Sequence, residues 1–313
     1  MQIFSSIDSY KGPRPVVSMG TFDGVHPGHR ALIEKVKDLA KRENTESVIL
    51  TFWPHPRIVL NQDVHKLRLL TTLEEKTKII SATGIDNLII VPFTKELADL
   101  TARQFVEELL VKKLNTLHLL MGYNHRFGKG GITFRELIPI AGSFNFGLSQ
   151  FKHIDVTGLA PSSTAIRNLL MEGKIQEANR MLGYRYTITG RVTGGMKIGR
   201  KLMYPTANLE ISEKAKLIPP DGVYACIVNV IGKTYGGMVN IGLRPTVSRQ
   251  MDNRTIEIHI LDFDRQIYSE EISIGFIVKT REEMKFANLD ELRQQLKKDE
   301  TQIRQILAQY SRE

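Results

Sequence analysis

Short apolar runs alternate with amphipathic stretches through the first half of the chain. The apolar runs are six or seven residues long and are expected to be strands, at 15–20, 47–52, 87–93 and 117–122. Between them, segments such as 31–43 and 102–114 carry apolar residues at helical spacing. This alternation predicts a parallel sheet with helices on both faces. Ligands of such sheets bind beyond the carboxyl ends of the strands, so residues at those ends are the first functional candidates.

The pattern changes in the second half of the chain. Two short helices are predicted at 165–173 and 175–183, and Gly183 suits the end of the second. Beyond them, β-like segments broken by Gly, Pro and Asp turns predict a small antiparallel barrel, at 186–192, 207–212, 223–232, 233–242, 255–263 and 271–278. A last amphipathic helix is expected at 289–310. We therefore expect two domains, 1–184 and 185–313.

Composition fits a folded cytoplasmic protein. A chain of 313 residues, 42% hydrophobic and 25% charged, is long enough for two globular domains and too apolar for a disordered chain. The single cysteine, Cys226, lies in an apolar run and is predicted to be a buried thiol, which favours a reducing compartment. Neither a signal-peptide pattern nor an apolar run of about 18 residues occurs, so we expect a cytoplasmic location and no membrane contact.

The net charge of +9 is compatible with nucleic acid, an anionic membrane or phosphorylated small molecules. Basic and acidic residues alternate in helical segments such as 34–43 and 290–300, which indicates solvated faces. Because no basic and aromatic ladder stands out, we expect no nucleic-acid partner. The sequence leaves the oligomeric state open.

The segment 20–29 combines features of a phosphate site. Gly20 and Gly28 allow close approach of backbone to an anion, and a helix predicted from Pro27 presents unpaired N–H groups. His26 and His29 project from its first turn, where they can stabilise charge on phosphate oxygens. A metal site is the weaker alternative because no third ligand lies nearby, and isolated histidines are often only structural.

Further candidates lie where later strands end. His55, between two prolines, contributes either a rigid turn or a ligand contact, and the glycine-rich segment 122–131 places Arg126 where it suits an anion or a planar ring. At 161–167, Ser162 or Ser163 can cap a helix that begins near Thr164. With an arginine one turn later, the same residues also form a phosphate clamp.

In the second half, the stretch 194–201 is close to a P-loop but has Arg200 and Lys201 where lysine and a hydroxyl residue belong. It still offers basic phosphate donors, and the block P-T-A-N that follows supplies Thr206 and Asn208 as hard oxygen ligands for Mg²⁺.

Seven motifs occur in one order: GTFDGVHPGH, GYNHRFGKG, SSTAIR, PTAN, DGVYA, NIGLRPT and IEIHILDF. The first resembles the H-x-G-H signature of the nucleotidyltransferase superfamily. The full set, over nearly the whole chain, resembles the bacterial bifunctional riboflavin kinases and FMN adenylyltransferases, the prokaryotic FAD synthetases. This resemblance implies a Rossmann-like domain that adenylates FMN to FAD with release of pyrophosphate. It also implies a barrel domain that phosphorylates riboflavin with ATP and Mg²⁺.

The resemblance implies roles residue by residue. His26, His29 and Glu257 would be catalytic, the last as the general base of the kinase, and Thr206 and Asn208 would bind the metal. ATP or phosphate contacts would come from Gly20, Thr21, Phe22, Asp23, Gly28, Ser162, Ser163, Thr164, Arg167, Gly194, Lys197, Gly199 and Arg200. Flavin contacts would come from His55, Asn124, Arg126, Arg281 and Glu283.

Three positions depart from the family pattern: His125 replaces an aromatic residue, Met203 a glycine and Thr21 a frequent asparagine. Met203 matters most, because a tight loop there would favour the conformational freedom of glycine. Two alternatives remain: an adenylyltransferase with a silent barrel, and a binding regulator built on inactive domains. The intact Thr206, Asn208 and Glu257 disfavour the first, and the full set of charged site residues disfavours the second. On its strand, Glu257 is expected to face away from the barrel core, which the alternating isoleucines fill.

Overall fold

A computed structural model describes residues 1–60, 67–123, 126, 128–151, 161–194, 203–243 and 254–310. The chain forms two compact units, residues 1–163 and 164–313. Among the helices in these described ranges, none has the length and apolar character needed to cross a membrane.

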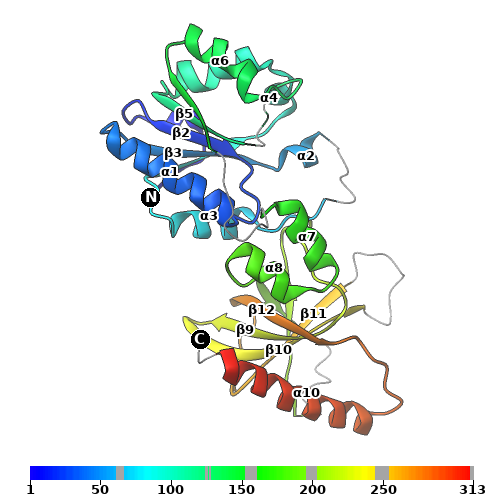
Figure 1. The fold of residues 1–313 in the computed structure, drawn as a ribbon. Helices are drawn as coiled ribbons and strands as arrows, with labels where there is room; N and C mark the ends of the chain where they lie inside the picture. The colour runs from blue at the N-terminus through cyan, green and yellow to red at the C-terminus, as the bar shows by residue number, and fades with distance from the viewer. Residues whose placement is uncertain are drawn as a thin grey trace. The chain divides into compact units, whose positions relative to one another are not determined.

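The first unit is built on a six-stranded parallel sheet with the order β1-β4-β3-β2-β5-β6 (Figure 1). Its strands are β1 (Gln2–Phe4), β2 (Val16–Gly20), β3 (Ser47–Trp53), β4 (Asn87–Pro92), β5 (His118–Gly122) and β6 (Gly147–Phe151). The four predicted strands and the parallel sheet are confirmed. The two edge strands were missed because they are short and only partly buried, so they show no clear apolar run.

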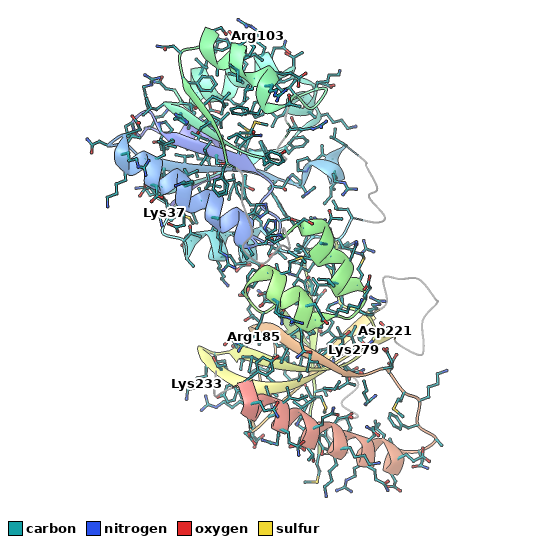
Figure 2. All side chains as sticks on the ribbon, in the orientation of Figure 1. Lys37, Arg103, Arg185, Asp221, Lys233 and Lys279 are labelled. Atoms are coloured by element: carbon teal, nitrogen blue, oxygen red, sulfur yellow. The ribbon has the colours of Figure 1, made fainter. Side chains whose placement is uncertain are left out.

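Helices cover both faces of this sheet, as predicted (Figure 1). They are η1 (Ile7–Ser9), α1 (Pro27–Arg42), α2 (Pro56–Val59), α3 (Leu73–Ser81), α4 (Lys95–Asp99), α5 (Ala102–Phe105), η2 (Val106–Lys113) and α6 (Phe134–Ser143). On one face, Val36 of α1 and Ile80 of α3 pack in one core cluster. On the other, α5, η2 and α6 pack against a second cluster. Charged side chains such as Lys37 and Arg103 reach the outer surface (Figure 2).

The strand order changes direction beside β2. After β2 the chain continues to β3 and β4 on one side, and it later adds β5 and β6 on the other side. The carboxyl ends of β2 and β5 therefore flank a topological switch point, where open α/β sheets bind their ligands. Gly20 is the last residue of β2, so segment 20–29 begins at this point.

The second unit contains a closed antiparallel barrel with the strand order β10-β11-β8-β7-β12-β9, as predicted. The barrel strands are β7 (Thr187–Thr193), β8 (Ala207–Glu210), β9 (Gly222–Val230), β10 (Lys233–Leu243), β11 (Arg254–Ile260) and β12 (Glu271–Arg281). The helices α7 (Ser163–Met171) and α8 (Ile175–Leu182) precede them, and α10 (Leu289–Tyr310) follows them. Gly183 ends α8 with φ 70°, as its position predicted. Asn179 of α8 donates to the Phe276 carbonyl at 2.8 Å, which fastens this helix to the barrel.

Alternating side chains separate the inside of the barrel from its outside. Cys226 is fully buried inside, and burial raises the pKa of its thiol, so the predicted core thiol is confirmed. Outside, Val223 and Met238 pack against Ile303 of α10. Near one end of the barrel the stem of Lys279 lies over Gly222, beside Asp221 (Figure 2). Gly222 has φ 145°, and a Cβ there would lie 2.6 Å from the backbone carbonyl oxygen of Arg281, so this position requires glycine.

Candidate active sites

A tight turn links β2 to α1 in the first unit. Phe22 and Val25 have φ values of 48° and 35°, and the Val25 N–H donates to the Phe22 carbonyl at 3.2 Å. Such left-handed conformations strain residues other than glycine and persist only where surrounding contacts fix them. The helix begins at Pro27, as predicted, with His26 at its N-cap. The first turn of this helix therefore lies just beyond the end of β2.

Both imidazoles of this turn lie against each other. The His26 and His29 rings are stacked with centroids 3.8 Å apart, and the edge of Phe22 meets His29 at 5.2 Å. A Cβ at Gly28 would lie 3.3 Å from the His26 ring, so the glycine leaves room for the stack. The structure thus brings together the two histidines that the sequence singled out, with a fixed mutual orientation that sequence reasoning did not foresee.

Asp23 fastens the turn to the segment that precedes α3. Its carboxylate is buried and accepts the backbone N–H groups of Leu70 and Thr71, both at about 3 Å. The Asp23 carbonyl in turn accepts the Ser163 hydroxyl at 2.8 Å, across 140 positions of sequence. These contacts give both residues a role in shaping the turn; direct contact of either with ATP stays a prediction.

Lys76 of α3 was missed by sequence reasoning. Its ammonium donates to the carbonyl of Thr21 at 3.0 Å and to the hydroxyl of Thr51, the latter on β3, at 3.1 Å. In sequence, a lysine in an amphipathic helix with neighbouring charges looks solvated, and only the packing of α3 on the sheet shows that it is buried.

The other predicted residues of the first unit are more scattered. His55 is the N-cap of α2, and its Nδ1 accepts the Arg57 N–H at 3.2 Å, which stabilises the turn into this helix. Arg126 is exposed, as is Ser162. Asn124 and His125 lie outside the described residues. Thr164 and Arg167 belong to the second unit, in the first turns of α7.

In the barrel, cross-strand register brings polar residues into one row. Glu257 of β11 is directly opposite Asn208 of β8 on one side and Asn240 of β10 on the other. Directly opposed residues share a face and lie about 5 Å apart at Cβ. Ile256 and Ile258 are buried while Glu257 is not, so the predicted alternation along this strand is confirmed.

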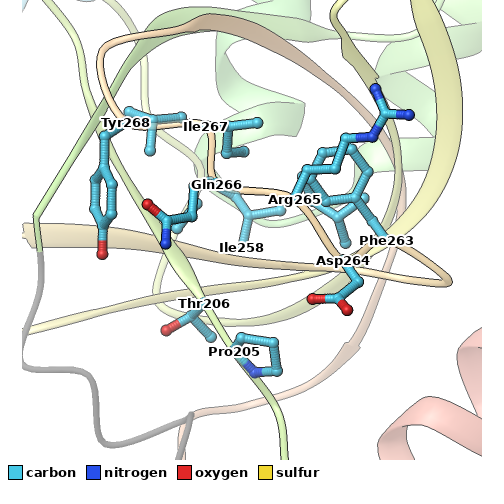
Figure 3. A pocket seen from close by; sticks show the side chains of 12 residues that line it. Pro205, Thr206, Ile258, Phe263, Asp264, Arg265, Gln266, Ile267 and Tyr268 are labelled. Atoms are coloured by element: carbon cyan, nitrogen blue, oxygen red, sulfur yellow. The ribbon is translucent and has the colours of Figure 1, made fainter.

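A cavity of about 500 Å³ lies beside Thr206 (Figure 3). Ala207 and Ile258 give it an apolar wall, and the loop 263–268 closes over it from Phe263 to Tyr268. This volume falls in the range of small-molecule sites, and polar groups at an apolar wall fix a ligand's orientation. Sequence reasoning missed the loop because it lacks both strand alternation and helical spacing.

Comparisons with known proteins give a match for each half of the chain. The FAD synthetase family model matches residues 10–165, and the riboflavin kinase model matches residues 182–307. Curated proteins named bifunctional riboflavin kinase/FMN adenylyltransferase are 37% identical over 96% of this chain in Listeria monocytogenes and 36% over 94% in Escherichia coli, covering 95% and 93% of those proteins. The chain belongs to the bifunctional riboflavin kinase and FMN adenylyltransferase family.

The fold of the family is also seen in a crystal structure. A protein from Streptococcus pneumoniae, described as a macrolide-efflux protein, matches with a TM-score of 0.85 and 27% identity. The match covers 97% of this chain and 98% of that one.

The glycine-rich stretch of the kinase half is only partly described. Gly194 follows β7, and among the residues that the structure describes none lies within 4 Å of where its Cβ would stand. Lys197, Gly199 and Arg200 lie outside the described residues. Met203 is 76% exposed, and its φ of 66° lies in the left-handed region. Glycine, the usual residue of the family at this position, adopts that conformation freely. The concern that the sequence raised about this position is therefore a real conformational one.

Arg281, expected over the flavin, is held by the last helix. Its guanidinium makes a bidentate ion pair with the buried carboxylate of Asp299, with Nη2 to Oδ2 at 2.7 Å and Nε to Oδ1 at 3.0 Å. Gln295 donates to the same carboxylate at 2.7 Å. The carboxylate of Glu283 lies against Gly242, where a Cβ would collide with it. Arg281 and Glu283 are thus both placed by protein contacts, and sequence reasoning missed Asp299.

The predicted metal ligands suit a hard divalent ion. Thr206 and Asn208 offer a hydroxyl and an amide oxygen two positions apart, and Asn208 is 8% exposed. Within the described ranges there is no cluster of three or more His, Cys, Asp and Glu residues that would favour a transition metal. Two oxygen donors fit Mg²⁺, which usually takes its other ligands from phosphates and water.

Proposed function

We propose that the first unit transfers an adenylyl group from ATP to FMN and that the barrel phosphorylates riboflavin. The observation that carries this division is the stacked pair of His26 and His29 at the start of α1. It lies at the switch point of the sheet, in a unit separate from the Glu257 row. The family match over both halves supports the same division.

In adenylyl transfer, a phosphate oxygen of FMN attacks the α-phosphorus of ATP and pyrophosphate leaves. Negative charge then increases on the α-phosphate oxygens and on the leaving group. The N–H groups of the first turn of α1 and the two imidazoles are fixed donors for this charge. Such chemistry needs positioning and charge stabilisation more than covalent help. The rigid, strained turn between Gly20 and His26 supplies the positioning.

In the kinase reaction, the terminal ribityl hydroxyl of riboflavin attacks the γ-phosphorus of ATP and ADP leaves. Glu257 accepts the hydroxyl proton, because a neutral alcohol is a poor nucleophile. Thr206 and Asn208 would hold Mg²⁺, which when bound neutralises charge on the ATP phosphates. The cavity beside Thr206 accommodates part of the nucleotide. Asn208 and Glu257 are opposed in the sheet, so metal and base would act on neighbouring oxygens.

The separation of activities can be tested with fragments. We propose that the functional boundary lies near residue 184, so a fragment from residue 182 should still convert riboflavin to FMN. A longer fragment from residue 164 retains Asn179 and its bond to the barrel, and it serves as the matched control for folding. If both fragments are folded by circular dichroism and neither makes FMN, the kinase does not reside in the barrel alone.

The whole chain is tested by incubation with riboflavin, ATP and Mg²⁺, followed by separation of the flavins. Formation of FAD supports both activities. FMN as the final product would contradict the adenylyltransferase, and conversion of supplied FMN without use of riboflavin would show a silent barrel. For location we propose the cytoplasm, since the one cysteine is a buried free thiol and needs no oxidising compartment.

A further inference from the structure

Lys76 places a positive charge inside the first unit, beneath the turn that carries the histidines. The side chain is 3% exposed, and its Nζ lies 5.4 Å from the centre of the Trp53 ring. It donates to the Thr21 carbonyl just after β2 and to the Thr51 hydroxyl on β3. The Thr51 hydroxyl also lies 3.4 Å from the Thr21 carbonyl. One ammonium therefore ties together α3, β3 and the start of the turn.

Folding stability does not account for this charge. Burial lowers the pKa of Lys76 to about 8, and the nearby Asp23 carboxylate opposes that shift only in part. Glu75, the neighbouring acid on α3, is engaged in a capping box with Thr72. A buried charge is costly, and replacement of buried ions by apolar residues of similar shape is often neutral or stabilising. The ammonium is thus retained at a cost in folding free energy.

The backbone at the start of the turn accepts the hydrogen bond that the Lys76 ammonium donates. The Thr21 carbonyl and the Phe22 N–H belong to the same peptide plane, so two donors on that carbonyl fix the plane and polarise its N–H. Phe22 follows with φ 48°, a strained conformation that its contacts must maintain, and its ring packs edge-on against His29. A shift of the Lys76 ammonium would therefore change the orientation of the His29 ring, because the Thr21–Phe22 peptide plane and the Phe22 ring connect the two.

We propose that Lys76 is a positioning residue for adenylyl transfer, whose ammonium fixes the Thr21–Phe22 peptide plane and through it the orientation of His29. The proposal rests on the assignment of His29 to this reaction. Lys76 itself does not touch the substrates, because its side chain is enclosed by the sheet and α3.

The decisive variant is Lys76→Met in the full chain, which keeps the straight side chain and removes the charge. We expect kcat for conversion of FMN to FAD to fall roughly 10- to 100-fold, as small displacements of catalytic groups cause. The melting temperature should stay equal or rise. Kinase turnover in the same preparation should stay unchanged, because the barrel is a separate unit.

Lys78→Met is the matched control on the same helix. Lys78 is exposed and pairs with Glu74 at 3.5 Å, so its replacement should alter neither activity. A Lys76→Met protein with a lowered melting temperature and normal turnover per folded molecule would overturn the proposal, because the role would then be structural.

Thr51→Val covers the case in which Lys76→Met fails to fold. It removes one acceptor of the ammonium without changing charge or shape, and we expect a smaller fall in kcat of the same kind. Unchanged turnover in a folded Thr51→Val protein would contradict the proposal. His29→Ala separates this inference from the function: if it leaves FAD formation intact, the assigned reaction site is wrong. If only His29→Ala has an effect, positioning by Lys76 is wrong.

Discussion

The two sites of this protein are assembled in different ways. In the first unit, one segment of ten residues, 20–29, contains the strand end, the turn, the helix start and both histidines. In the barrel, the proposed residues are spread from Gly194 to Glu283. Asn208 and Glu257 meet only through strand register, and Arg281 is held by the last helix. Local sequence therefore specifies most of the first site, whereas the second depends on closure of the barrel.

The sites also differ in what holds them. The first has a strained turn that is held by the hydrogen bonds of buried groups such as Asp23 and Lys76. The second is fixed from outside by α10, where Glu300 accepts the Tyr204 hydroxyl at 3.0 Å next to the Asp299 pair. Arg304 holds Asp262 at 2.8 Å, beside the loop that lines the cavity. One helix thus holds both Asp262, next to the loop that lines the cavity, and Arg281, the proposed flavin contact.

Glu257→Gln should give the largest effect and test whether the barrel site acts alone. The substitution keeps shape and hydrogen bonding but removes most of the basicity, and general-base assistance contributes ~10²–10⁴ in rate. FMN production from riboflavin should fall by a factor in that range, while supplied FMN is still converted to FAD. Kinase turnover close to that of the original protein would remove Glu257 from the mechanism.

His29→Ala is the corresponding test of the first site. Loss of a fixed donor to developing charge typically costs ~10²–10³ in turnover. FAD formation should fall by that factor, and FMN formation from riboflavin should be nearly intact. Equal loss of both activities would contradict this prediction, because it would show that the two sites are not independent.

The buried ammonium of Lys76 should make the free energy of unfolding depend on pH. Lys76 has a pKa of about 8 in the folded protein against an ordinary value of 10.5, so between these pH values the unfolded state binds more protons. The free energy of unfolding therefore rises with pH across that window. Relative to Lys76→Met, the original protein should gain up to roughly 3 kcal/mol between pH 7 and pH 10.5.

Urea unfolding followed by tryptophan fluorescence can measure this difference. Trp53 is the one tryptophan of the chain and lies beside Lys76, so its emission reports on the first unit. A difference between the two proteins that does not change with pH would mean that Lys76 titrates at its ordinary value.

Asp299→Asn should have the smallest effect on activity, and it tests whether α10 holds Arg281 in place for the kinase. The amide keeps a hydrogen bond to Arg281 but loses the charge, and charge-assisted bonds are roughly twice as strong as neutral ones. We expect the riboflavin KM to rise on the order of tenfold, which corresponds to about 1.4 kcal/mol, with the ATP KM little changed. Asp290→Asn, exposed in the first turn of the same helix, is the control. An equal rise for both substrates would contradict a specific link to Arg281.

Residues at strand and helix ends could be predicted because their surroundings are local. Gly183 ends α8 and Pro27 begins α1 where the sequence placed them, since helix caps depend on the residue itself and its immediate neighbours. Lys76 and Asp299 could not be predicted. Each is a charged residue in an amphipathic helix, and in sequence it cannot be told from the solvated residues beside it.

The sequence by itself determined the four inner strands of the first sheet, the strands of the barrel, the H-x-G-H turn and the face on which Glu257 lies. These follow from hydrophobic period and from turn chemistry within about ten residues. Only the tertiary structure decided the stacking of His26 on His29, the cavity under loop 263–268 and the burial of Lys76. The physical reason is that burial and orientation depend on which distant segment packs against a side chain. The tertiary fold, and not local propensity, determines which segment that is.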